Sequence, residues 1–137
     1  MRPTWEEYFF NIASSTAERS TCPRLSVGAV VVKDKQIIAT GYNGSVVGTD
    51  HCDDVGCFML GNSCVRTVHA EQNAILTASK QGISLKGAEI YVTHEPCYNC
   101  LKYIIQSGID VVHYQEPYIS STTQELKEQI LEKVDID

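Results

Sequence analysis

Two short motifs contain residue types that bind zinc, His69-Ala70-Glu71 and Pro96-Cys97-Tyr98-Asn99-Cys100. Cys97 and Cys100 are three positions apart, so on a helix both sulfur atoms can reach one ion, and a helix N-terminus favours their thiolates. His69 supplies a third ligand. Three protein ligands with an open fourth position are typical of catalytic zinc, whereas structural zinc sites normally have four. The spacing therefore predicts a catalytic zinc on His69, Cys97 and Cys100.

Glu71 is the residue that a purely structural metal site would not need. If His69 caps the helix that follows it, both His69 and Glu71 can approach the ion. A carboxylate that is not itself a ligand can take a proton from the activated water and return it to the substrate. In the alternative interpretation these four residues are a buried histidine, an acid favoured at a helix start and two small core cysteines. That interpretation requires four coincidences. We therefore predict that Glu71 is the proton shuttle of a hydrolytic enzyme.

Hydrophobic periodicity predicts the helices that must position these motifs. Residues 4–20 fit an amphipathic helix that starts with a capping box. The two metal-binding motifs lie at the starts of two further helices, 67–81 and 96–107, each followed by a glycine. Residues 122–134 fit an acidic helix, which we expect to be a solvated face.

Four apolar runs predict the strands. Residues 27–32 and 37–42 fit an antiparallel hairpin, and residues 89–93 and 109–114 lie between the helices. This order predicts an α/β layer fold with parallel pairings after the opening hairpin. Residues 41–66 are rich in Gly, Asn, Asp, Cys and Ser and predict a long loop, which in a compact domain is usually functional or tied by a ligand.

The composition fits one globular domain over residues 1–137, with 43% hydrophobic and 20% charged residues. No apolar run approaches the roughly 20 residues of a membrane span, and the start of the chain lacks the apolar stretch of a secretory signal. We therefore expect a cytoplasmic protein with no membrane partner. The net charge of −6 and the absence of a Lys/Arg cluster in the sequence argue against a nucleic-acid partner and leave room for a small anion site.

Six cysteines in a chain without an export signal predict reduced thiols with metal-binding or catalytic roles. Four of them, Cys22, Cys52, Cys57 and Cys64, lie in or beside the predicted loop, with His51 nearby. They are candidates for a second, structural zinc site that would pin the loop, and the alternative is small buried thiols. Spacing alone does not choose among these five ligands.

The His-x-Glu and Pro-Cys-x-x-Cys motifs together resemble the signature of the zinc-dependent cytidine deaminase superfamily. The likeness extends to the deoxycytidylate (dCMP) deaminases of the bacterial and phage kind, from about residue 22 to residue 118. It is carried by residues 27–32, 41–44, 64–75 and 91–97. The resemblance implies an α/β fold, a three-layer α/β/α sandwich with a mixed, mostly five-stranded central sheet.

The resemblance also implies the activity and the substrate contacts. It implies hydrolytic deamination of dCMP to dUMP and ammonia, which would supply dUMP for thymidylate synthesis, with attack at C4 of the cytosine ring and Glu71 protonating N3. Asn43 matches the family asparagine that bonds the deoxyribose, the Ala70 N–H would hold the base carbonyl, and Tyr118 resembles the family tyrosine near the nucleotide. Arg24 is our candidate for the 5′-phosphate, because one arginine can hold a phosphate bidentately.

Members of this family are often hexamers that dCTP activates and dTTP inhibits, with Mg²⁺, near the loop at residues 41–44. The resemblance implies such a homo-oligomer and such effectors here. Deamination of another nucleoside or base, or of adenosine in tRNA, is the alternative within the same zinc chemistry, although an acidic chain argues against tRNA. A catalytically idle zinc module is a different alternative, and the presence of Glu71 argues against it.

Overall fold

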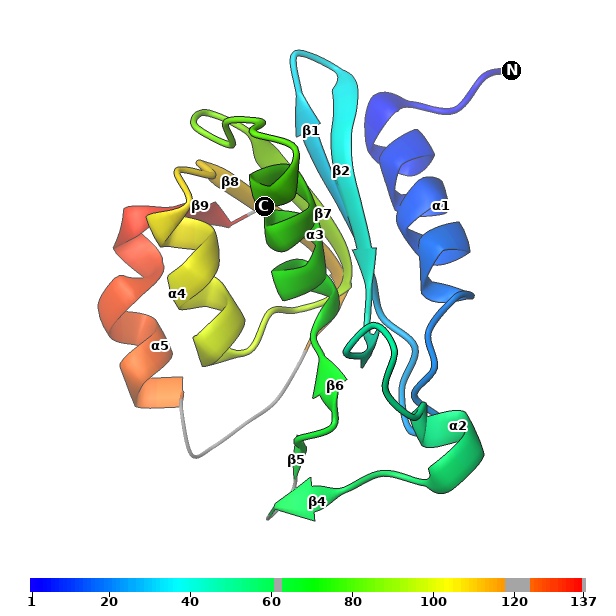
Figure 1. Cartoon of the computed structure of the whole chain (residues 1–137). Helices are drawn as coiled ribbons and strands as arrows, with labels where there is room; N and C mark the ends of the chain where they lie inside the picture. Colours follow the sequence, from blue (N-terminus) through cyan, green and yellow to red (C-terminus); the bar gives the residue numbers. More distant parts are fainter. Residues whose placement is uncertain (61–62, 118–123, 137) are drawn as a thin grey trace.

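Five strands form a mixed sheet at the centre of the fold (Figure 1): β1 (Gly28–Lys33), β2 (Gln36–Tyr42), β7 (Glu89–His94), β8 (Val111–Glu116) and β9 (Asp135–Ile136). The structure is a computed structural model that describes residues 1–60, 63–117 and 124–136. The strand order is β2-β1-β7-β8-β9. Strand β1 pairs antiparallel with β2 and β7, and β8 pairs parallel with β7 and β9. Parallel pairing therefore begins at β8, and the predicted mixed five-stranded sheet is confirmed.

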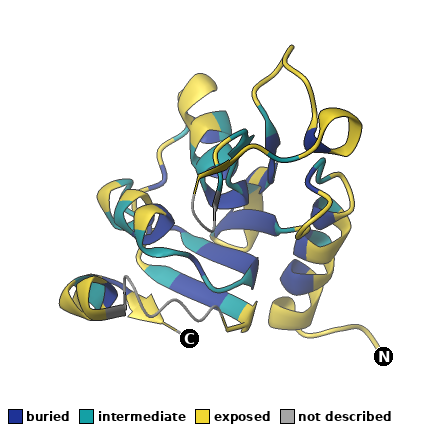
Figure 2. Cartoon of the chain, turned by 90° about the horizontal axis from the view of Figure 1, so that it is seen from below, coloured by how far each residue is buried: buried dark blue, intermediate teal, exposed yellow. Residues whose placement is uncertain are grey.

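Helices cover both faces of this sheet and make three layers (Figure 1). Helix α1 (Trp5–Ala17) packs on one face, and α3 (Ala70–Lys80) and α4 (Tyr98–Gln106) pack on the other. Helix α5 (Gln124–Ile130) lies against α4 and leads into a 3₁₀ turn, η1 (Leu131–Lys133). Figure 2 shows the buried residues concentrated in the sheet and on the helix surfaces that face it. This is the predicted α/β/α sandwich.

The alternation of side chains along β1 explains the two-sided core. Val30 and Val32 belong to an apolar cluster with Phe9 and Ala13 of α1. The intervening Ala29 and Val31 belong to the second cluster, on the side of α3 and α4. Since both faces of β1 are buried, the strand reads as a continuous apolar run in the sequence. Among the described residues, no helix combines the length and apolar character needed to cross a membrane.

Short elements occupy much of residues 41–66, where a long loop was predicted. β3 (Gly44–Ser45) pairs antiparallel with β6 (Thr67–Val68), and between them lie α2 (Cys52–Val55) and a hairpin of β4 (Met59–Leu60) with β5 (Ser63–Cys64). The loop prediction was therefore wrong in part. Strands of 2 residues and a helix of 4 residues are too short to leave a hydrophobic period in the sequence.

The C-terminal segment also departs from its prediction. The helix expected over residues 122–134 ends at Ile130, and the chain then adds β9 to the sheet beside β8. Lys127 of α5 is only 3% exposed, and its ammonium group pairs with the carboxylate of Glu95, which lies between β7 and α4. The expectation of a solvated helix was therefore wrong at Lys127. A pair between residues far apart in the sequence leaves no local pattern that would predict it.

We expect Lys127→Met to lower the free energy of unfolding by about 1–3 kcal/mol, because the partly buried Glu95 carboxylate would lose this cation. Urea denaturation measures the change. Lys133→Met is the matched control, since Lys133 is 64% exposed and lies 3.8 Å from Glu132, and it should cost at most about 0.5 kcal/mol. Equal losses in the two variants would contradict a special role for the buried pair.

Candidate active site

Three predicted metal ligands meet where two helices begin. His69 is the N-cap of α3, Cys97 is the N-cap of α4, and Cys100 lies in the first turn of α4. His69 Nδ1 lies 3.2 Å from Cys100 Sγ and 3.7 Å from Cys97 Sγ, and all three atoms lie within 4.8 Å of one another. The His69 N–H donates to Gln72 Oε1 at 3.0 Å, which fixes the entry into α3. The fold thus brings together the histidine and cysteines of both motifs.

The chemistry of this donor set fits zinc. Two sulfurs and one imidazole nitrogen are borderline-soft ligands of the kind zinc takes in catalytic sites, with room for a further ligand. Cys100, with help from His69, lowers the pKa of Cys97 to about 4 by hydrogen bonding, although burial opposes this. The same contact with Cys97, together with burial, raises the pKa of Cys100. Hydrogen bonding thus favours a thiolate at Cys97, the form that binds metal, and a metal bound there would deprotonate the second thiol as well.

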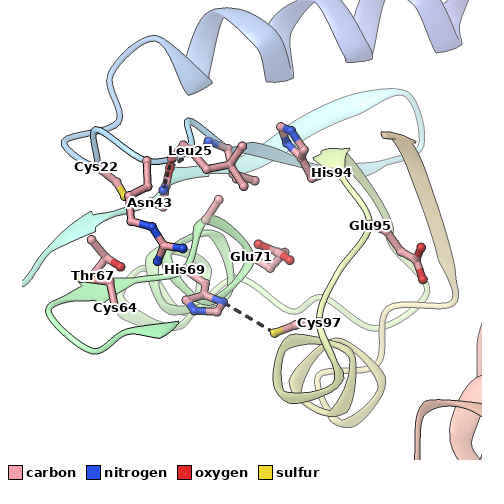
Figure 3. A pocket seen from close by; sticks show the side chains of 13 residues that line it. Cys22, Leu25, Asn43, Cys64, Thr67, His69, Glu71, His94, Glu95 and Cys97 are labelled. Atoms are coloured by element: carbon pink, nitrogen blue, oxygen red, sulfur yellow. Dashed lines mark hydrogen bonds between the residues drawn. The ribbon is translucent and has the colours of Figure 1, made fainter. Parts of the chain in front are cut away.

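Glu71 lies in the first turn of α3 and is 5% exposed. Burial raises the pKa of Glu71 to about 7, so the carboxyl group can both accept and return a proton near neutral pH. Figure 3 shows the side chains of His69, Glu71 and Cys97 around one space. The arrangement is a metal-ligand set with a proton-transfer group beside it.

These side chains line a cavity of about 370 Å³, a volume that suits a small molecule. One wall is formed by the segment before β1, and the opposite wall by β6 and the start of α3. The end of β7 and the start of α4 complete it, and there His94 is a lining residue that sequence reasoning did not assign to the site. The sequence feature that could have identified His94 is its position at the carboxyl end of a strand, directly before the Glu95-Pro96-Cys97 motif.

The predicted substrate contacts lie in this cavity where the structure describes them. Arg24, Asn43 and Ala70 all line it. Arg24 Nη1 donates to Met59 Sδ at 3.2 Å, and Ala70 is the first residue of α3, whose N–H has no acceptor within the helix. Tyr118 lies outside the described residues. The roles given to these residues stay predictions.

Asn43 holds the segment before β1, which forms one wall of the cavity, through two hydrogen bonds. Its Nδ2 donates to the Leu25 carbonyl at 2.7 Å, and its Oδ1 accepts from the Val27 N–H at 2.8 Å (Figure 3 marks the Leu25 bond). At 8% exposure these bonds are shielded from water. Asn43 therefore shapes the pocket in addition to any contact with a ligand.

We expect Asn43→Ala to destabilise the fold by about 1–3 kcal/mol, because two sheltered backbone groups lose their partners. Thermal or urea denaturation measures this loss. Asn73→Ala is a matched control, since the Asn73 Nδ2 donates to a single carbonyl, that of Tyr42, at 2.8 Å. If Asn43→Ala lowers the free energy of unfolding no more than Asn73→Ala does, the inference that Asn43 holds two backbone groups is contradicted.

Three of the four remaining cysteines also converge. The sulfurs of Cys52, Cys57 and Cys64 lie within 4.8 Å of one another. Cys22 is not part of this group, and it lines the cavity, as Cys64 does. His51, the fifth candidate, is exposed and belongs to neither metal-binding group found among the described residues. The structure thus brings three of the predicted ligands together, all of them cysteines, and a metal at this cluster stays a prediction.

The comparisons with known proteins agree with this geometry. The family model for the cytidine and deoxycytidylate deaminase zinc-binding region matches residues 3–116. ComE operon protein 2 of Bacillus subtilis (strain 168) is 54% identical over 140 residues, which span 99% of this chain and 74% of that protein. Deoxycytidylate deaminase of Mycobacterium phage D29 is 44% identical over 124 residues, which span 82% of this chain and 95% of that protein.

A solved structure gives the same answer for the fold. The crystal structure of dCMP deaminase from the cyanophage S-TIM5 in complex with dCMP and dUMP matches with a TM-score of 0.84 and 33% identity. The match covers 100% of this chain and 98% of that chain. Because the family model matches residues 3–116, which include the site, and the phage D29 relative is 44% identical over 82% of this chain, the chain belongs to the cytidine and deoxycytidylate deaminase family.

Proposed function

We propose that this chain is a dCMP deaminase that converts dCMP and water into dUMP and ammonia. The observation that carries the proposal is the buried Glu71 carboxylate beside the His69, Cys97 and Cys100 ligand set, inside a nucleotide-sized cavity. The choice of dCMP is supported by relatives that carry the name deoxycytidylate deaminase over most of their own length.

Each residue of the site has a separate task in this proposal. His69, Cys97 and Cys100 would hold a zinc ion, which would supply Lewis-acid activation of a water molecule. Glu71 takes one proton from the water and gives it to N3 as the water oxygen bonds to C4 of the cytosine ring. Glu71 then moves the remaining hydroxyl proton to the amino group, the C4–N bond breaks to release ammonia, and the oxygen stays as the C4 carbonyl of dUMP. The Ala70 N–H, at the positive end of α3, holds the base carbonyl.

The remaining part of the nucleotide meets the wall formed by residues 22–27. Asn43 is the proposed partner of the deoxyribose and Arg24 that of the 5′-phosphate, and both line the cavity. Tyr118, outside the described residues, keeps the role near the nucleotide that the family resemblance implies. One guanidinium can hold two phosphate oxygens at once, so phosphate binding needs no basic surface in a chain with a net charge of −6.

A panel of substrates tests the proposal. The zinc-loaded protein should release ammonia from dCMP, and should do so far more slowly from CMP, deoxycytidine, guanine and tRNA. Stripping the metal with a chelator should abolish the release, and zinc should restore it. Faster turnover of a free base, a nucleoside or tRNA would reject dCMP as the substrate, and no turnover of any of them would reject the enzyme.

Arg24→Ala should raise the KM for dCMP by roughly tenfold or more, because a charged, bidentate contact is lost. The same change should leave the slow reaction with deoxycytidine nearly unaltered, since that substrate has no phosphate. Steady-state kinetics with both substrates measure the difference. Parallel losses on dCMP and deoxycytidine would show that Arg24 acts on the shape of the pocket instead.

We also propose that the enzyme supplies dUMP for thymidylate synthesis in the cytoplasm, as a homo-hexamer that dCTP with Mg²⁺ activates and dTTP inhibits. The support for this is the likeness of the loop at residues 41–44 to regulated family members. Rates measured across dCMP concentrations with and without each effector, together with the mass of the assembly in solution, test it. Hyperbolic kinetics that neither nucleotide changes would reject the regulation.

A further inference from the structure

The side chain of Asn43 has one fixed orientation in the wall of the cavity. Its Nδ2 donates to the Leu25 carbonyl at 2.7 Å, and its Oδ1 accepts from the Val27 N–H at 2.8 Å. The backbone N–H of Asn43 donates to the Val27 carbonyl at 3.3 Å as a third bond. Because one backbone partner needs a donor and the other needs an acceptor, they determine which amide atom is nitrogen and which is oxygen.

The hydrogen-bonding capacity that Asn43 has left matches one hydroxyl group. An asparagine amide has two N–H donors and two acceptor lone pairs, and the bonds to Leu25 and Val27 use one of each. One donor and one acceptor remain for a ligand. A hydroxyl group can accept from the remaining N–H and donate to the oxygen at the same time. Asn43 can therefore satisfy one sugar hydroxyl in full, and its amide has no capacity for a second.

The backbone groups beside Asn43 in this wall are already bonded. The N–H and the carbonyl of Val27 both bond to Asn43, as does the carbonyl of Leu25. Ser26 lies between these two residues, but it is exposed and does not belong to the described residues that line the cavity. Next to Asn43 the wall thus presents the apolar side chains of Leu25 and Val27 to the cavity.

Val27 is the more buried of these two apolar side chains. It is half-buried and packs against the apolar cluster on the α3 and α4 side of the sheet, while it also lines the cavity. Leu25, in contrast, is 45% exposed. A ligand atom that lies against Val27 is therefore better shielded from water than one that lies against Leu25.

We propose that Val27 makes the enzyme specific for deoxyribonucleotides, because it gives the 2′-hydroxyl of a ribonucleotide no hydrogen-bond partner. This inference rests on the proposed function, in which Asn43 bonds the deoxyribose. The free hydroxyl of that sugar, at C3′, takes the remaining donor and acceptor of Asn43. C2′ is bonded to C3′ and lies against the side chain of Val27. In dCMP it carries only hydrogen, whereas in CMP it carries a hydroxyl that would lose water and gain no partner.

The size of the discrimination follows from this cause. A hydroxyl that is buried without a partner should lower kcat/KM for CMP to about 10- to 100-fold below that for dCMP. The chemical step at C4 of the base is the same in both nucleotides, so the difference arises at the sugar. Thr67, a lining residue with a hydroxyl of its own, belongs to β6 in the opposite wall.

The wild-type protein tests the cause with three substrates, dCMP, CMP and 2′-deoxy-2′-fluoro-CMP. Fluorine is close to a hydroxyl in size, but it donates no hydrogen bond and loses less when it leaves water. We expect kcat/KM for the fluorinated nucleotide to lie within about threefold of that for dCMP. A fluorinated nucleotide that reacts as slowly as CMP would show exclusion by size and would overturn the proposal.

Val27→Thr tests the residue. Threonine keeps the branched shape and the backbone bonds to Asn43, and it adds a hydroxyl that can bond the 2′-hydroxyl. The variant should raise kcat/KM for CMP by about tenfold. Val55→Thr is the matched control, since Val55 is 51% exposed and does not belong to the described residues that line the cavity. The control should leave kcat/KM for both nucleotides unchanged.

The remaining outcomes separate this proposal from the proposed function. A folded Val27→Thr protein that gains nothing on CMP overturns the role of Val27 while dCMP deamination stands. Equal kcat/KM for CMP and dCMP in the wild type would show that another lining group, such as His94, receives the 2′-hydroxyl, and it also overturns the proposal. A wild-type protein that turns over none of the three nucleotides rejects the proposed function, and this inference with it. The fluorinated substrate needs no variant, so the test holds even where Val27→Thr does not fold.

Discussion

Replacing Glu71 by glutamine should lower the turnover of dCMP by about 10²- to 10⁴-fold while the protein still binds zinc. The amide has the shape of the carboxyl group and cannot carry a proton from water to the ring. The buried position of Glu71, at 5% exposure, also keeps bulk water from replacing it as a base. Ammonia release under saturating dCMP measures the loss, and metal analysis of the same sample shows whether the ligand set is intact.

Glu95→Gln is the matched control for this variant. Glu95 lines the same cavity, but its carboxylate pairs with Lys127, and Figure 3 shows it directed away from His69 and Glu71. Its replacement should therefore reduce turnover by less than about tenfold. Near-normal turnover in Glu71→Gln would remove the assigned role, and loss of zinc from it would mean that Glu71 supports the metal and not the proton transfer.

The active-site geometry was predictable because each motif is local. His69 and Glu71 share one helix start, as do Cys97 and Cys100, so residue spacing already determines how each pair lies. What joins the two motifs is the packing of α3 and α4 on one face of the sheet, and the strand–helix alternation in the sequence indicates that arrangement. The meeting of His69 with both cysteines follows from these two facts.

The parts that sequence did not predict depend on contacts between distant residues. The pair between Lys127 and Glu95 and the addition of β9 beside β8 bring the C-terminal segment onto residues far earlier in the chain. Neither leaves a hydrophobic period or a turn signal. The cysteine cluster is intermediate, because composition marked the residues as metal ligands and only the fold showed which sulfurs gather, those of Cys52, Cys57 and Cys64.

Gly41→Ala is the second change with a large expected effect, and it acts through the close packing of β2 against α3. A Cβ at position 41 would lie 2.3 Å from the Ala70 carbonyl oxygen and 2.5 Å from the Ala74 nitrogen, both in the backbone of α3. Backbone atoms cannot move aside as a side chain would, so the first turn of α3 must shift. We expect a loss of about 1–3 kcal/mol in the free energy of unfolding.

The same shift should reduce turnover by on the order of 10²-fold, since His69 and Glu71 start that helix and small displacements of reacting groups are costly. Gly44→Ala is the matched control, because its Cβ would first meet the side-chain Oγ1 of Thr21, at 3.2 Å, which can rotate away. Urea denaturation and kcat, measured on both variants, separate the two effects. A Gly41→Ala protein that is as stable and as active as Gly44→Ala would contradict this prediction. It would mean that the first turn of α3 stays in place without the close approach of β2. The position of Glu71 would then depend on the metal ligands alone.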